Sequence, residues 1–157
     1  MPLTDDQLLT RLNERMSPAS LLLGAKLVQL DSKRGYVRIA FEAKQEFCNP
    51  IGGIQGGFVA AMLDEAASIA AVAYAQKKIG FPTAEFKVMF LAPARPGLLY
   101  AEGRVLKLGS RRAALEADLF DPHGLRLARM SATALPAPME ASVLATASSI
   151  PNGSTAS

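Results

Sequence analysis

The feature that most restricts the fold is an alanine-rich apolar stretch, Phe58–Ala75, with two adjacent acids near its middle, Asp64 and Glu65. Its length would suffice for a membrane span, but each acid costs about 2.5–3.5 kcal/mol at a bilayer centre. Small side chains on nearly every side instead suit a helix that a sheet surrounds closely. We therefore predict one long helix buried inside a protein domain, with no membrane partner.

A glycine-rich loop leads directly into this helix. The segment Asn49–Gly57 contains four glycines and one proline, a composition that breaks regular structure and lets the backbone approach another group closely. A helix N-terminus offers unpaired N–H groups and the positive end of the helix dipole. Gly56 and Gly57 could let a ligand oxygen reach these groups and hold an oxyanion. The alternative is that both glycines only permit a tight turn into the helix.

Periodicity predicts a second, shorter helix and six strands. A capping box at Thr4–Gln7 starts a helix over residues 5–15. Alternating residues predict a hairpin at 26–31 and 36–41, and four more strands in a meander at 83–91, 98–108, 111–120 and 125–135. Turns are expected at Gly109-Ser110, as type II′, and at Asp121–Gly124. This order indicates an α+β fold with one antiparallel sheet against one central helix.

Composition limits the possible functions. The 157 residues include 17 Lys and Arg against 14 Asp and Glu, for a net charge of +3 without a basic block, which argues against a nucleic-acid partner. The single cysteine, Cys48, and the single histidine, His123, disfavour a disulfide, a metal site and a histidine-activated nucleophile.

We expect a helical N-terminal segment at 1–19, one domain at 20–135, and a disordered tail at 136–157 that is rich in Ala, Ser, Thr, Pro and Gly. The first 20 residues contain no apolar core of a secretory signal, so we expect a cytoplasmic protein.

The two acids of the long helix are the best candidates for chemistry. Burying a carboxylate without a purpose costs several kcal/mol, so Asp64 or Glu65 should face water, a partner or a substrate. A general base or a nucleophile would use such a group. Ser68 lies one turn after Asp64 and could hydrogen-bond it or position a water. The alternative is an acidic, solvated stripe on the helix.

Distance then suggests a site shared between two copies of the chain. Gly57 and Asp64 are seven residues apart, about 10 Å along a helix axis. A nucleophile and an oxyanion donor should both lie roughly 3 Å from the reacting group. Two antiparallel copies of the helix would bring Gly57 of one chain near Asp64 of the other, and an isologous dimer is the simplest assembly that does so.

The pattern Asn49, Gln55-Gly56-Gly57 and Asp64 resembles the Asn…His-Gly-Gly…Asp motif of PaaI-type hotdog-fold acyl-CoA thioesterases. The segment Thr83–Gly97 resembles the next strand and the Pro-Ala…Gly turn of that family, and the resemblance covers about residues 20–135. It implies a hotdog fold, in which an antiparallel sheet wraps around one long central helix. It also implies a homodimer with a continuous sheet, which commonly pairs again into a homotetramer, a dimer of dimers.

The resemblance further implies hydrolysis of an acyl-CoA, with CoA as part of the substrate and no separate cofactor. The Gly57 N–H would polarise the thioester carbonyl, Asp64 of the opposite subunit would act as nucleophile or general base, and Asn49 would orient the attacking group. Gln55 departs from the family's histidine: it can donate a hydrogen bond but cannot titrate near neutrality. This departure leaves a non-catalytic acyl-CoA-binding protein as the alternative. An acyl-CoA hydratase ranks below both, because His123 is remote from Asp64 in the sequence.

The remaining candidates would bind the substrate. The resemblance implies hydroxyls at Ser68 and Thr83, and a phosphate contact at Arg111 or Arg112, near Arg104 and Lys107. Gly56 would lie beside the carbonyl. Apolar side chains near the helix would receive the acyl group, and the candidates are Phe58, Met62, Phe81 and Phe86.

Overall fold

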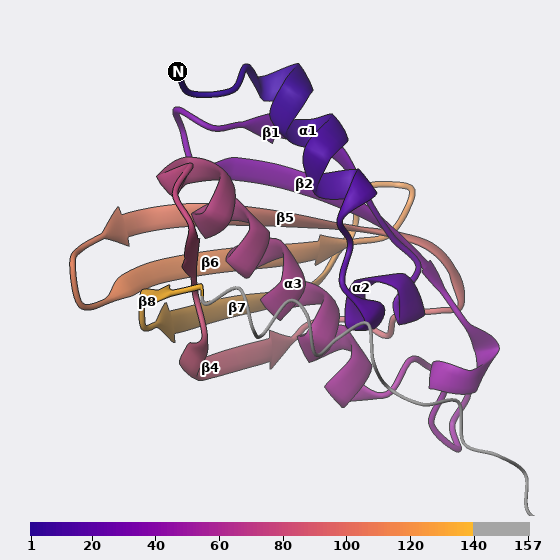
Figure 1. Ribbon diagram of the computed structural model, residues 1–157. Coiled ribbons are helices and arrows are strands. Elements are labelled where there is room, and N and C mark those ends of the chain that lie inside the picture. The colour runs from indigo at the N-terminus through magenta and orange to yellow at the C-terminus, as the bar shows by residue number, and fades with distance from the viewer. Residues whose placement is uncertain (140–157) are drawn as a thin grey trace, which may run out of the picture.

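An antiparallel sheet of six strands curves around the long helix α3 (Gly56–Ala75) in the computed structural model, which describes residues 1–139 (Figure 1). Nine residues of α3 are buried, and its alanines allow the sheet to approach closely. The predicted α+β hotdog architecture is confirmed. By length and composition α3 could also cross a membrane, but here it is the core helix of the domain.

The strand order corrects one prediction. From one edge to the other, the order is β1 (Ala25–Asp31), β2 (Tyr36–Ala43), β5 (Gly97–Leu108), β6 (Ala113–Phe120), β7 (Arg126–Ala134) and β4 (Thr83–Phe90). The predicted four-strand meander is therefore wrong: β4 pairs with β7 and forms an edge, while β5 pairs with β2. Alternation of side chains locates a strand and its two faces, but it carries no information on which strand lies beside it.

The closest contact between helix and sheet is at Gly103 of β5. A Cβ atom at this position would lie 2.0 Å from the carbonyl oxygen of Ala66. Only a residue without a side chain lets β5 pass α3 at this distance. Gly103 therefore fixes how deeply α3 sits in the sheet.

Short elements complete the fold. Helix α1 (Asp5–Glu14) has the predicted capping box, and α2 (Pro18–Leu22) follows with Ser17 as its cap. A single 3-10 turn, η1 (Gln45–Phe47), precedes the glycine-rich loop. Two further strands, β3 (Ile79–Gly80) and β8 (Ala137–Pro138), pair with each other. Of the predicted tail, 136–157, residues 136–139 are described and 137–138 are in a small sheet, whereas 140–157 lie outside the described residues.

The two predicted turns have different outcomes. The Asp121–Gly124 turn is closed by a hydrogen bond from the Gly124 N–H to the Asp121 carbonyl. The β5–β6 connection is four residues long, and the Gly109 N–H donates to the carbonyl of Arg112. Gly109 is not among the residues with positive φ, so the predicted two-residue type II′ turn is wrong, since that turn requires positive φ at its first central position.

Candidate active site

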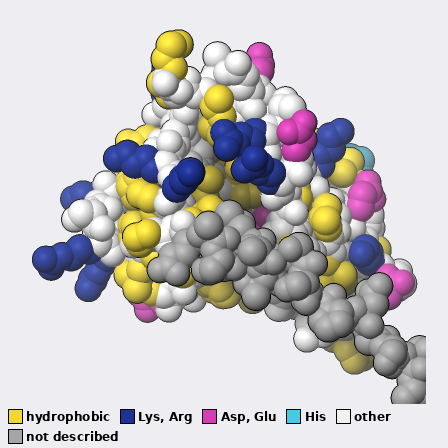
Figure 2. Space-filling model, in the orientation of Figure 1, with side chains coloured by type: hydrophobic (Ala, Val, Ile, Leu, Met, Phe, Trp, Pro, Cys, Tyr) yellow, Lys and Arg dark blue, Asp and Glu magenta, His cyan; other side chains and the backbone are white. Residues whose placement is uncertain are grey.

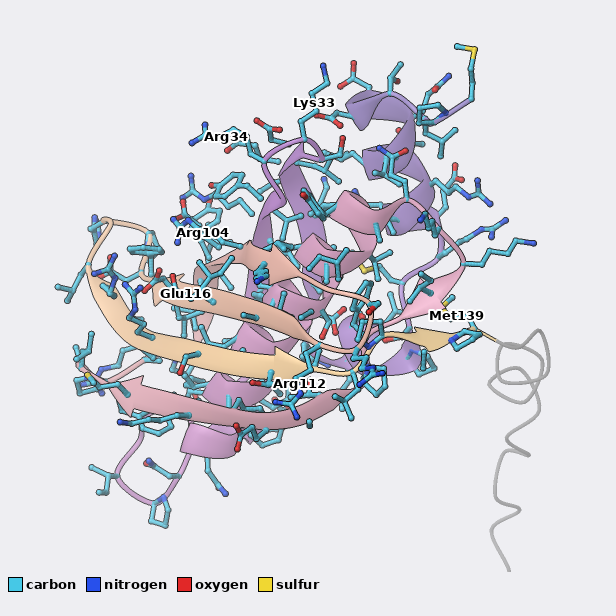
Figure 3. All side chains as sticks on the ribbon, turned by 90° about the vertical axis from the view of Figure 1, so that its left-hand side faces the viewer. Lys33, Arg34, Arg104, Arg112, Glu116 and Met139 are labelled. Carbon is cyan, nitrogen blue, oxygen red and sulfur yellow. The ribbon has the colours of Figure 1, made fainter. Side chains whose placement is uncertain are left out.

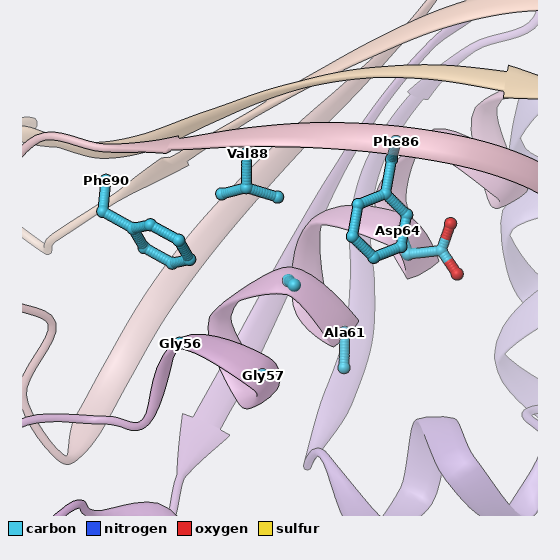
Figure 4. A pocket seen from close by; sticks show the side chains of 8 residues that line it. Gly56, Gly57, Ala61, Asp64, Phe86, Val88 and Phe90 are labelled. Atoms are coloured by element: carbon cyan, nitrogen blue, oxygen red, sulfur yellow. The ribbon is translucent and has the colours of Figure 1, made fainter.

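Two cavities meet at the N-terminus of α3. The first has a volume of about 580 Å³, lies between α3 and β4, and includes Gly57, Asp64 and Phe86 in its lining (Figure 4). The second has a volume of about 500 Å³ and lies beside the glycine-rich loop, with Asn49, Val59 and Arg95 in its lining. Gly56 and Phe90 line both. The two cavities are therefore neighbours at the first turn of the helix.

The N-terminus of α3 faces these cavities with unpaired amides. Gln55 is the N-cap residue, but its side chain caps no backbone group and is exposed. The first N–H groups of a helix have no partner within it, so the amides of Gly56 and Gly57 are open to a ligand. A Cβ at Gly57 would meet no atom within 4 Å. Together with the helix dipole, these amides form a site for a carbonyl or an oxyanion.

Asp64 lies two turns further along the same wall of the first cavity. Its side chain is half-buried, and its Oδ1 accepts a hydrogen bond of 2.6 Å from Oγ1 of Thr83 at the start of β4. This contact brings together two of the predicted site residues. The Thr83 hydroxyl thus holds the Asp64 carboxylate from one side. The carboxylate borders the same apolar cavity as the free backbone amides, which lie at the N-terminal end of α3.

Glu65 points away from this cavity and makes a different contact. Its carboxylate accepts a hydrogen bond from Oγ of Ser20, a buried residue of α2. Burial raises the pKa of Glu65 above its ordinary value, the bond from Ser20 acts against that rise, and the charge of Asp64 adds to it. Of the two adjacent acids, one borders the cavity and the other anchors the N-terminal segment to α3.

Asn49 shapes the loop beside the second cavity. Its Oδ1 accepts from the N–H groups of Ile51 and Gly53, at 3.0 and 3.3 Å. Because the side-chain oxygen is used by the backbone, the amide nitrogen Nδ2 is the group that Asn49 offers to a ligand. Asn49 and Asp64 line different cavities of the one chain.

Several other predicted residues lie away from both cavities. Phe58 stacks on Phe47 with ring centroids 4.2 Å apart, so its ring is packed against η1. Ser68 and Gln55 line neither cavity, and Asp64 binds Thr83 instead of Ser68. Of the four residues predicted to receive the acyl group, Phe86 alone lines one of these cavities, whereas Met62 and Phe81 are buried in the core.

The predicted phosphate contacts lie at the far end of the sheet. Arg111 and Arg112 are exposed in the β5–β6 connection, beyond the point where β5 passes Ala66 in the middle of α3. Neither lines the two cavities of the same chain. Arg104 is engaged elsewhere, since it pairs with Glu102 and with the fully buried Asp118; Figure 3 shows it beside Glu116 on the neighbouring strand.

Two neighbours of Phe86 on β4, and a residue of the loop after β4, border the site without having been predicted from the sequence. Phe86, Val88 and Phe90 extend from β4 toward α3 (Figure 4). Successive side chains of a strand alternate between its faces, so naming Phe86 as a lining residue could have led to Val88 and Phe90. Arg95, in the loop after β4, is the charged residue in the lining of the second cavity. Its position in a Pro-Ala-Arg-Pro turn carried no local signal for binding.

The charge distribution fits a small-molecule site. On the face that Figure 2 shows, basic side chains are scattered among apolar and acidic ones. Among residues 1–139, no three His, Cys, Asp or Glu side chains are grouped so that they could hold a metal ion. The groups that border the two cavities are the backbone amides at the start of α3, the Asp64 carboxylate, the Arg95 guanidinium and neutral polar groups.

Comparison with known proteins identifies the fold and its relatives. The family model of the thioesterase superfamily matches residues 52–128. The chain is 30% identical over 102 residues to the "Putative esterase SSO2140" of Saccharolobus solfataricus, an alignment that covers 65% of this chain and 71% of that protein.

Among solved structures, a phenylacetic acid degradation-related protein of Ralstonia eutropha JMP134 is 27% identical, with a TM-score of 0.74 over 82% of this chain and 98% of that one. Escherichia coli PaaI, from the phenylacetic acid degradation operon, is 16% identical, with a TM-score of 0.73 over 85% and 93% of the two chains. A Streptococcus mutans protein bound to acetyl-CoA is 15% identical, with a TM-score of 0.66 over 74% and 90%. At these last two identities the likeness shows the fold alone.

Proposed function

Because the chain belongs to the thioesterase superfamily, we propose that it hydrolyses the thioester bond of an acyl-CoA. The observation that carries this proposal is that the free amides at the start of α3 and the Asp64 carboxylate both face one apolar space beside the edge strand β4, where a second copy of the chain would bring its own Asp64 to these amides. A thioester carbonyl beside the amides of Gly56 and Gly57 would be polarised by them. The same amides would stabilise the oxyanion that forms when the carbonyl carbon is attacked.

In this proposal Asp64 either attacks the carbonyl carbon itself, forming a mixed anhydride that water then hydrolyses, or takes a proton from the water that attacks. Collapse of the oxyanion breaks the C–S bond, and CoA leaves as a thiolate that takes up a proton. The hydroxyl of Thr83 holds Oδ1, which leaves Oδ2 to act. The cavity's apolar walls, Ala60, Ala61 and Val88, strengthen the electrostatic interactions of the carboxylate and of the amide dipoles. Asn49 would orient the attacking group through Nδ2, and Gln55 would donate to the thioester from the mouth of the site.

We propose that a second copy of the chain completes the site. Gly57 and Asp64 of one chain are about 10 Å apart along α3, too far to act on one carbonyl. Strand β4 is an edge of the sheet, and Phe86, Met89 and Phe90 on it are 46–57% exposed. Pairing of two β4 strands in a homodimer would cover these side chains and place Asp64 of one copy near Gly57 of the other. The partner's Arg111 or Arg112 would then be the phosphate contact, and a homotetramer would form by pairing of such dimers.

The test is free-thiol release from a panel of acyl-CoA esters by the wild type and by Asp64→Asn. We expect Asp64→Asn to lose at least about 100-fold in kcat with its fold intact. The matched control is Glu65→Gln, which alters the adjacent acid outside the cavity and should retain thiol release. Equal rates for wild type and Asp64→Asn would refute the role of Asp64.

One observation favours a second candidate function. Gln55 stands in the cap position where a titratable group would be expected in this motif, and a neutral amide can bind a thioester without promoting its turnover. In that case the chain would be a non-catalytic acyl-CoA-binding protein. Saturable binding of acyl-CoA esters by calorimetry, without thiol release, would identify it.

A further inference from the structure

We propose that Phe90 sets the acyl-chain length that the site accepts, by partly closing the passage from the helix N-terminus to an acyl pocket formed by the second cavity. This inference rests on the proposed function. Phe90 lines both cavities, as does Gly56 across from it. A Cβ at Gly56 would lie 3.1 Å from Cζ of Phe90. The ring therefore rests against the helix backbone at the point where the cavities meet.

The position of the thioester follows from the amides. A carbonyl bound at the N–H groups of Gly56 and Gly57 lies at this junction, so one arm of the substrate extends into each cavity. The first cavity is bordered by Gly57, which is exposed at the first turn of α3. In the proposal, the long polar CoA arm enters past this exposed turn, and the acyl group extends the other way.

The second cavity has the character of an acyl pocket. Its wall includes Ile54, Val59 and Leu127, which are 5%, 3% and 3% exposed. Its volume of about 500 Å³ is in the range of small-molecule sites, which are mostly apolar with few polar groups. The exposed Arg95 supplies its charge. An unbranched acyl tail that leaves the carbonyl in this direction must pass the Phe90 ring.

Removal of the ring should therefore widen the passage and favour longer acyl chains. We expect Phe90→Ala to raise the ratio of kcat/KM for dodecanoyl-CoA over butanoyl-CoA by about tenfold or more, since one methylene in an apolar pocket is already worth roughly 10-fold in discrimination. Phe90→Trp should lower the same ratio. The matched control is Leu106→Ala, because Leu106 on β5 is 58% exposed against 57% for Phe90 and lines neither cavity.

The two proposals fail in distinguishable ways. Thiol release with the same chain-length ratio in wild type, Phe90→Ala and Phe90→Trp would overturn the role of Phe90 and leave the thioesterase proposal standing. A shift in Leu106→Ala as large as in Phe90→Ala would also overturn it. If the wild type releases no thiol, the hydrolase proposal fails. The preference for chain length is then measured by calorimetry, as the ratio of the Kd values for butanoyl-CoA and dodecanoyl-CoA. A rise of this ratio in Phe90→Ala and a fall in Phe90→Trp would still support the role of Phe90. If Phe90→Ala does not fold, the Phe90→Trp ratio decides.

Discussion

Oγ1 of Thr83 lies 2.6 Å from Oδ1 of Asp64, and this hydrogen bond ties the first residue of the edge strand to the middle of the core helix. The contact fixes the carboxylate from the side of β4. If Asp64 activates the attacking oxygen, the orientation of its carboxylate depends on this hydroxyl.

Thr83→Val keeps the shape of the side chain and removes the donor, so we expect kcat for acyl-CoA hydrolysis to fall by about tenfold or more. Thr83→Ser should restore most of the loss because it restores the hydroxyl. Thr133→Val, the same change on half-buried Thr133 of β7, is the control for a general effect of losing a hydroxyl from the sheet. An undiminished kcat in Thr83→Val would mean that the bond has no part in catalysis.

Mixing two inactive variants tests whether the site is shared between subunits. Gly57→Pro removes one N–H at a position in the first turn where proline is tolerated, and Asp64→Asn removes the acid. A dimer has two shared sites. In a heterodimer of the two variants, one site contains both substitutions and the other contains neither, so one of the two sites is intact. An equal, fully exchanged mixture should then recover roughly a quarter of the wild-type rate, since half the dimers are mixed.

A site within one chain predicts no recovery in that mixture. Gly57→Ala, which retains the N–H and whose Cβ meets no atom within 4 Å, should exceed Gly57→Pro in kcat by at least about tenfold. Subunit exchange is verified by mass spectrometry of differently tagged chains.

Gly103→Ala should be among the most destabilising single substitutions in this chain. The added Cβ would lie 2.0 Å from the Ala66 carbonyl oxygen, and two backbone segments have to separate to admit it. We expect a loss of about 3 kcal/mol or more in the free energy of unfolding, measured by urea denaturation. Gly57→Ala, which adds the same methyl in open space, is the control and should change stability little.

The buried carboxyl of Glu65 should make stability depend on pH. Its folded-state pKa is raised above the ordinary 4.5 by burial, so its protonated form favours the folded state. This contribution is fully present below the unfolded-state pKa and is lost as pH rises through the folded-state pKa. Relative to the wild type, Glu65→Gln should therefore gain stability as pH is raised from 4 to 8 in urea titrations. A constant difference across that range would show that Glu65 does not titrate differently in the two states.

Local sequence patterns were sufficient to predict most helices and strands. They failed where contacts between distant segments determine the position of an element. The capping box at Thr4 and the alanine-rich run gave α1 and α3, because both signals lie within the element itself. The position of β4 at the sheet edge could not be predicted. An edge strand that pairs with another subunit is as apolar as a central strand, so its composition does not distinguish the two positions. The Asp64–Thr83 contact joins residues 19 positions apart, and only the packing of helix on sheet brings them together.

The candidate site was predicted in the same uneven way. Asp64 was identifiable because an acid inside an apolar helix is costly, and Gly57 because glycines precede the helix. Phe58 is a large apolar residue of the kind that lines pockets, but its ring stacks on Phe47. That contact depends on the position of η1, and a single 3-10 turn has no periodic sequence pattern from which it could be predicted. Phe90 is one of several large apolar residues in β4, and its place between two cavities depends on Gly56, in another element.

In the described part of the chain, the outer edge of β4 does not pair with another strand of the sheet, and this affects how single chains associate. Its backbone groups can template a strand from any neighbouring molecule, and the side chains around it are apolar. Lys87, exposed at mid-strand, is the kind of residue that discourages indiscriminate addition of strands. Self-association through this edge would therefore act as protection against aggregation, and a variant that cannot associate would be prone to form fibres.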